Sequence, residues 1–231
     1  MIAWMTAFGQ LSFGPAEWQA LRVSLEVSAL STCLVALPGT GLGLLLGRCQ
    51  FRGKLILDAL IHLPLVLTPV VVGLLLLMAL GREGLLGIDI AYTRSAAVLA
   101  SAVIALPLVV RSVRTAAELV DDRLLEAAAV LGAGPVRRFW EVLLPLSRPG
   151  IAAGLTLGFA RSLGEFGATI TFAGNFPGET RTLPAAIYTA SQTPGGDGSA
   201  MALTLASVAL SFLALLGSEW WMRRSRGRGQ R

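Results

Sequence analysis

The stretch Val27–Leu46, VSALSTCLVALPGTGLGLLL, contains twenty consecutive residues without a charge. About 20 predominantly apolar residues are what an α-helix needs to cross the hydrocarbon core of a bilayer. The whole chain has the same character: of its 231 residues 54% are hydrophobic and 14% are charged, and the mean hydropathy is +0.69. Soluble proteins carry about 25% charged residues. The composition therefore predicts an integral membrane protein, and it argues against a soluble enzyme, a disulfide-stapled secreted module or a disordered tail.

Four further stretches are apolar enough to cross a bilayer. Several contain prolines, which helices tolerate inside a bundle because neighbouring groups satisfy the freed carbonyls. The stretch that begins near Pro149 must include Arg161 and Glu165 to be long enough. We therefore expect a single all-α domain embedded in the lipid bilayer, with five transmembrane helices at about residues 27–46, 60–80, 95–113, 149–173 and 200–221. Residues 182–196 are too short and too polar for a sixth span, and we expect an outer loop with a short helix that either stays at the surface or dips into the bundle.

The positions of the basic residues predict the orientation, because Lys and Arg accumulate in cytoplasmic loops. If the N-terminus is outside, the inner segments carry fourteen of them (Arg48, Arg52, Lys54, Arg111, Arg114, Arg123, Arg137, Arg138, Arg148, Arg223, Arg224, Arg226, Arg228 and Arg231). The outer segments then carry four (Arg22, Arg82, Arg94 and Arg181). This asymmetry predicts an N-out, C-in topology. It also accounts for the net charge of +5 without a nucleic acid partner.

The inner segment at about residues 114–148 has a helix–turn–helix pattern. Asp121–Leu131, DDRLLEAAAVL, combines strong helix formers with acidic residues in the first turn, where they favour the helix dipole. Gly132, Gly134 and Pro135 then break the helix, and the stretch VRRFWEVLLPL predicts a second short helix that Pro145 ends. On shape alone, an ordinary loop at the membrane interface would fit this pattern as well.

The residues of this segment also resemble a known motif. Glu126-Ala127-Ala128, Gly132 and Val142-Leu143-Leu144-Pro145 are similar to the EAA loop of ABC importer permeases, which reads EAA, three residues, Gly, nine residues and Ile-x-Leu-Pro. The one departure is Val142 in place of isoleucine. The resemblance implies a coupling helix that docks on a separate ATP-hydrolysing subunit. It assigns to this coupling loop Glu126, Ala127, Ala128, Gly132, Val142, Leu144 and Pro145.

Three further stretches narrow the resemblance. HLPLVLTPVVVG (62–73), ARSLGEFGATITFAGN (160–175) and PGETRTLPAAIYTASQTPGGD (177–197) are similar to the molybdate permease subunits of bacterial importers. Sulfate permeases share a related GEFG stretch, so sulfate or tungstate permeases are the alternatives. The resemblance implies a homodimer around a central anion path in the bacterial inner membrane. It also implies two cytoplasmic ABC ATPase subunits and an extracytoplasmic molybdate-binding protein as partners.

Five residues of the expected fourth span are polar enough to line such a path. Arg161 and Glu165 are charges at membrane depth, which are costly and usually pair or face a water-lined route. They either shape a pore or gate, or form a structural ion pair, or the glutamate bonds backbone at a dimer interface. Ser162, Thr169 and Thr171 offer neutral hydroxyls, which can bind a tetraoxoanion weakly enough to release it. The alternative for these three is simple helix packing.

The sequence supplies no chemistry for an enzyme. A phosphate-binding P-loop reads G-x-x-x-x-G-K-[ST]. Lys54 is the only lysine and follows Gly53, but Arg48 stands at the first glycine position and Leu55 replaces the hydroxyl. We therefore expect no cofactor or metal in this chain, with ATP and Mg bound by the partner ATPase. An intramembrane enzyme would need facing nucleophiles or metal ligands, which we do not find, and a pure channel would predict uptake that persists without ATP.

Overall fold

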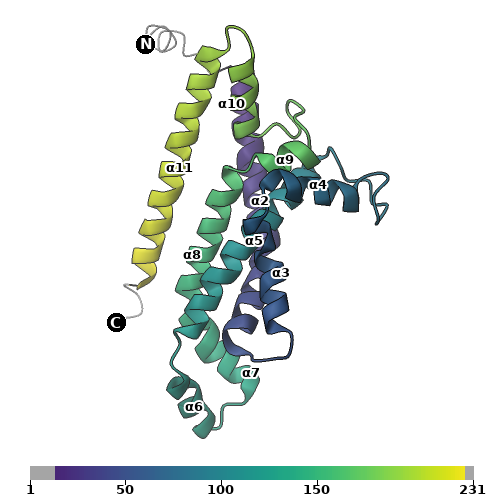
Figure 1. The fold of residues 1–231 in the computed structure, drawn as a ribbon. Helices are drawn as coiled ribbons and strands as arrows, with labels where there is room; N and C mark the ends of the chain where they lie inside the picture. The colour runs from purple at the N-terminus through teal and green to yellow at the C-terminus, as the bar shows by residue number, and fades with distance from the viewer. Residues whose placement is uncertain (1–13, 227–231) are drawn as a thin grey trace.

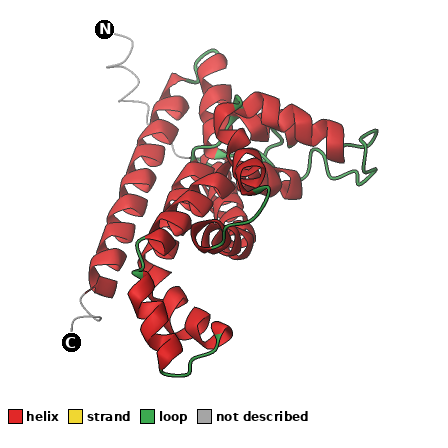
Figure 2. Ribbon diagram, turned by 60° about the horizontal axis from the view of Figure 1, so that its bottom comes forward, coloured by secondary structure: helices red, strands yellow, loops and turns green. Residues whose placement is uncertain are grey.

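The computed structural model describes residues 14–226, so Arg228 and Arg231 of the basic tail lie outside the described part. Within that part every regular element is helical (Figure 2). Four helical segments are long and apolar enough to cross a membrane, and a bent pair of helices adds a fifth if it is counted as one span. The expected all-α membrane class is confirmed, with four or five spans.

Three long helices form the centre of the bundle: α2 (Pro15–Arg48), α5 (Arg94–Glu118) and α8 (Leu144–Leu163). Helix α5 lies between the other two and is the most buried of them (Figure 1). Small residues let the backbones approach closely, as in other membrane helix pairs. Gly39, Gly43 and Gly47 of α2 face Val109, Val113 and Ala117 of α5, and on α8 Gly150, Gly154 and Gly158 face Ala116, Ser112 and Val109.

The second expected span, 60–80, is not one kinked helix. The chain forms α3 (Lys54–Val66) and α4 (Pro69–Leu80), which are bent by 114° relative to each other. Leu67 and Thr68 are extended between them. The bend has a local cause, because a proline disfavours the helical conformation in the residue before it. Helix α4 turns aside from the long axis of the bundle and packs on α9 (Figure 1).

The fourth expected span, 149–173, also differs from the single helix predicted from the sequence. Helix α7 (Pro135–Arg138), the π-helical turn η1 (Phe139–Leu143) and α8 follow one another without interruption, so Pro145 does not end a helix. The π turn explains the continuity, because the Leu144 amide donates to the carbonyl of Phe139, five residues back, just before the proline that lacks an N–H. Helix α8 then ends at Leu163, and a break separates it from α9 (Gly167–Phe172).

Two further helices lie at the N-terminal end of α2 and along α8 (Figure 1). The short helix expected within 182–196 is present as α10 (Leu183–Gln192), and the last expected span lies within α11 (Asp197–Arg226). Helix α10 packs against α11 and α2, with Leu183 and Ala186 buried against Ala20 and Leu203. The third expected span, 95–113, lies within α5 as predicted.

Candidate functional site

The predicted coupling loop folds as a short helix followed by a sharp turn. Helix α6 (Asp122–Val130) begins after Asp121, whose carboxylate accepts a 2.9 Å hydrogen bond from the Arg123 amide. It is followed by Gly132, whose φ of +85° lies in the left-handed region. Glycine adopts this conformation without the steric cost that a Cβ imposes. The helix and the turn predicted from the sequence are therefore both present.

The loop presents an apolar surface that nothing in the described structure covers. None of the residues of α6 is buried, and Glu126, Ala127 and Gly132 are exposed. Val130 is 88%, Leu131 87% and Trp140 62% exposed. Helices α6 and α7 project beyond the bundle at its lower end (Figure 1). Exposed apolar clusters of this kind mark interaction surfaces.

The second half of the motif has a different environment. Val142, Leu144 and Pro145 are half-buried where the π turn joins α8. Leu144 packs against a core cluster that contains buried Leu143. The motif residues thus fall into an exposed part on α6 and a part that anchors the second helix to the bundle.

One arginine connects α6 to a helix that is distant in sequence. Arg48, the last residue of α2, places Nη1 2.6 Å from Oδ1 of Asp122 and donates from Nη2 to the carbonyl of Val120 at 2.5 Å. Its side chain is only 17% exposed. The sequence pattern indicated no partner for Arg48, since the separation of 74 positions between the partners hides the contact. The contact therefore joins the start of α6 to the end of α2.

A second ionic cluster joins α3 to α5 at the same end of the bundle. Arg114 Nη1 lies 3.0 Å from Oδ1 of Asp58, and the same oxygen lies 3.3 Å from Nδ1 of His62. Arg114 also pairs with Glu118 at 2.9 Å. The cluster holds α3, whose packing on the bundle is otherwise light, against α5.

The five predicted pathway residues lie around the break between α8 and α9. Arg161 Nη1 is 2.7 Å from Oε2 of Glu165, so the predicted pair forms although Glu165 lies outside the helix. The side chain of Glu165 is 1% exposed, and its Oε1 accepts a 2.9 Å bond from the Ala168 amide at the start of α9. Of the alternatives, these contacts favour a structural ion pair and backbone bonding for Glu165.

The three hydroxyl residues are turned inward in this conformation. Ser162 is buried and accepts a 3.0 Å hydrogen bond from Ser31 of α2. Thr169 is buried, and half-buried Thr171 donates to the carbonyl of Gly167 at 2.8 Å. The bonds of Ser162 and Thr171 are those of helix packing, whereas the buried Thr169 hydroxyl has no hydrogen-bond partner within the described residues. The role of all three in a path stays a prediction.

The structural role of Glu165 can be tested with variants that remove the Arg161 ion pair alone or together with the Ala168 hydrogen bond. In Glu165→Gln the amide oxygen still accepts the bond from Ala168 but the ion pair is lost, whereas Glu165→Leu loses both. Because a buried donor without a partner costs about 1–3 kcal/mol, we expect the leucine variant to melt at a clearly lower temperature than the glutamine variant in detergent. Equal melting temperatures would show that the Ala168 bond contributes nothing.

The fold and the loop define a class of protein. A bundle of membrane helices, with one of its spans bent by 114° and a helix–turn–helix exposed at one end, has the architecture of an ABC importer permease. The profile of the family described as "Binding-protein-dependent transport system inner membrane component" matches residues 39–227. The chain belongs to this family and is an inner membrane protein.

Individual relatives agree with this assignment. The chain is 53% identical over 224 residues to the "Molybdenum transport system permease protein ModB" of Escherichia coli (strain K12), which covers 93% of this chain and 97% of that protein. The fold of this chain is similar to that of a chain of the MetNI methionine ABC transporter in an inward-facing conformation. The TM-score is 0.74 and the identity 20%, and the match covers 93% of this chain and 99% of the other. The fold is also similar to a chain of a bacterial alginate ABC transporter, solved in complex with a periplasmic protein. The TM-score is 0.76 and the identity 19%, and the match covers 97% of this chain and 87% of the other.

Proposed function

We propose that this chain is the permease subunit of an ATP-driven molybdate importer. The observation that carries the proposal is the 53% identity to a molybdenum transport permease over nearly the whole length of both chains. The subunit works as a homodimer around the anion path, in the N-out, C-in orientation that the arginine distribution predicts. A binding protein delivers the anion at the outer face.

Two ATPase subunits dock on the loops formed by α6 and α7, and they bind the ATP and Mg that this chain has no P-loop to bind. Exposed Leu131 and Trp140 supply the apolar contact surface. The contact between the ATPase and the loop transmits motion to the membrane helices. Residues Pro135–Leu163 form one helical segment of 29 residues that leads from the loop into the membrane. A displacement of the loop therefore moves α8 as a rigid helix. The ion pair of Arg48 with Asp122 moves α2 together with the loop.

The transport cycle follows from this connection. ATP binding brings the two ATPases together, the loops carry that motion to the helices, and the path changes from inward-facing to outward-facing. Hydrolysis resets it. Such rigid-body switching between two packed arrangements is common in transport and allosteric proteins.

The test is reconstitution of the complex in liposomes. We expect the permease to co-purify with its ATPase subunits and ATP hydrolysis to rise when molybdate-loaded binding protein is added outside. Uptake of molybdate should require ATP, and competition by tungstate and sulfate separates the alternatives within the class. ATP hydrolysis by the purified permease alone would contradict the division of labour, and uptake without ATP would indicate a channel.

A further inference from the structure

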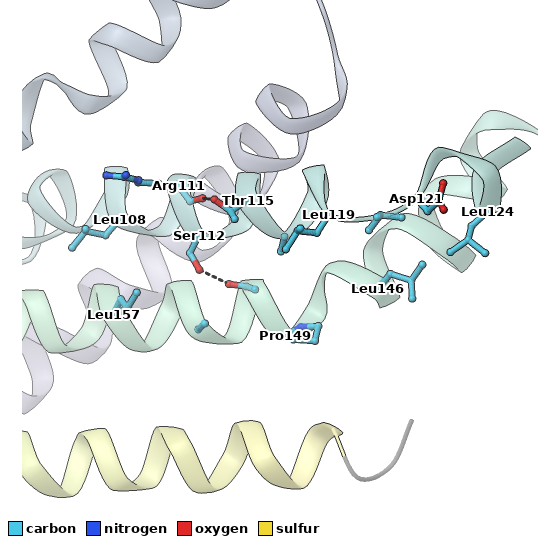
Figure 3. Close-up of a pocket in the computed structure, with 14 residues that line it drawn as sticks. Leu108, Arg111, Ser112, Thr115, Leu119, Asp121, Leu124, Leu146, Pro149 and Leu157 are labelled. Carbon is cyan, nitrogen blue, oxygen red and sulfur yellow. Dashed lines mark hydrogen bonds between the residues drawn. The ribbon is translucent and has the colours of Figure 1, made fainter. Parts of the chain in front are cut away.

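A groove of about 690 Å³ runs between α5 and α8 toward the start of α6 (Figure 3). It is mostly apolar, with Leu108, Leu119 and Leu157 among its lining residues. Two residues that line it can carry a charge. Arg111 lies toward one end and Asp121 toward the other (Figure 3).

The groove lies on the side of α5 that faces away from α2. Val109 and Val113 face the glycines of α2, and Arg114 reaches Asp58 of α3. Successive residues of an α-helix are rotated by about 100°, which places Arg111 about 200° around the helix from Val109. Since α2, α3 and α8 cover the other sides of α5, the groove faces the remaining open side of the bundle.

Arg111 has no carboxylate partner within the described residues. Most other arginines of the long helices α2, α5 and α8 are paired, since Arg22, Arg48, Arg94, Arg114 and Arg161 each contact an aspartate or a glutamate. Arg148 of α8 has no such contact in the described part of the chain either, but it does not line the groove. Arg111 is therefore the arginine of this groove whose exposed guanidinium can bind an anion from outside the described residues.

The groove offers few other donors. The Ser112 hydroxyl donates to the carbonyl of Gly150 at 2.9 Å, and the Thr115 hydroxyl donates to the carbonyl of Arg111 at 3.0 Å. Asp121 accepts a bond from the Arg123 amide, which caps α6. Among the described lining residues, the guanidinium is thus the one group that can attract a negatively charged ligand.

We propose that Arg111 is part of the inner mouth of the anion path, where it attracts the transported tetraoxoanion as it leaves the membrane. The inference rests on the proposed function and adds a residue to it. A doubly charged anion crossing low-dielectric surroundings needs a compensating charge, and a cation in a cleft with apolar walls raises its local concentration. Because the Arg111 side chain is exposed and no other cation among the described residues lines the groove, the contact is weak enough for release, as passage through a path requires.

The test replaces and then restores the charge. Arg111→Cys is made in a chain in which the exposed cysteines Cys33 and Cys49 are replaced by alanine, and the complex with ATPases and binding protein is reconstituted in liposomes. Molybdate uptake should fall on the order of tenfold, the lower end of the range for electrostatic focusing, with ATP hydrolysis retained. A cationic, membrane-impermeant methanethiosulfonate applied from the cytoplasmic side should restore uptake, and an anionic one should not.

The control is Arg52→Cys in the same background, because Arg52 is an exposed arginine that does not line the groove. Neither reagent should change its uptake. Arg111→Lys and Arg111→Gln give a second measurement, and lysine should retain most of the uptake that glutamine loses.

Two results would overturn the inference: unchanged uptake in Arg111→Gln, or equal effects of the cationic and anionic reagents on the Arg111→Cys variant. A wild-type complex that shows no ATP-dependent molybdate uptake would instead contradict the proposed function, so the two failures can be told apart.

Discussion

Gly43→Leu is expected to prevent the chain from accumulating as a folded membrane protein. A Cβ atom at Gly43 would lie 2.6 Å from Cβ of Val113 and 2.9 Å from the carbonyl oxygen of Val110. The oxygen belongs to the backbone of α5, so a side-chain rotation cannot remove the clash. Overpacking of a core costs about 1–3 kcal/mol, occasionally more, and here two long helices must separate. That cost is a large part of the roughly 5–15 kcal/mol by which folded proteins are stable.

The measurement is the yield of monodisperse protein after detergent extraction, together with its melting temperature. Gly41→Leu is the matched control on the same helix, because a Cβ at Gly41 meets nothing within 4 Å. It should behave like the wild type. Similar yields and melting temperatures for the two variants would mean that α2 and α5 are not held in the close contact described here.

Gly132→Val is expected to abolish ATP-driven uptake while the helical bundle stays folded. Gly132 has a φ of +85°, and a Cβ there would meet nothing within 4 Å, so the cost comes only from backbone conformation. Strained conformations of this kind cost about 1–3 kcal/mol. Because the turn projects from the bundle, the chain can relieve the strain by changing the angle between α6 and α7. That change misplaces the apolar tip without disturbing the buried helices.

Gly134→Ala is the control two residues away. Gly134 has φ −65° and ψ 169°, which any residue adopts, and its Cβ position is open. We expect normal uptake and normal association with the ATPases for this variant. Normal coupling in Gly132→Val would show that the loop angle does not matter, and the assignment of the coupling loop would lose its support.

Signals confined to a few neighbouring residues were sufficient to predict the helix–turn–helix, whereas its assignment as a coupling loop came from the resemblance to the EAA motif. The acidic first turn of α6, the position of its end and the turn at Gly132 all follow from chemistry within a short stretch of chain. Two features of the expected second and fourth spans were harder. Pro69 disfavours a helical Thr68 and so indicates a break there, but the 114° angle and the contact of α4 with α9 are visible only in the folded chain. Pro145 was expected to end a helix, and the π turn before it lets the helix continue.

Some charge pairs were likewise predictable from the local sequence, and others were visible only in the folded structure. Arg161 and Glu165 are four residues apart, and their contact was predictable from that spacing. Arg48 meets Asp122 across a separation of 74 positions, and no local pattern indicates that pair. The availability of Arg111 was equally hidden, because only the assembled bundle shows which arginines already have partners.

By itself, the sequence determined the membrane class, the expected orientation and the helix–turn–helix loop, because apolar run length, charge placement and turn chemistry act over short distances along the chain. The tertiary structure decided how sharply the second expected span bends, which arginines are paired over long separations and which face of α5 stays open. These features depend on contacts between helices that are far apart in the chain, such as the close approach of the glycine faces of α2 and α8 to α5.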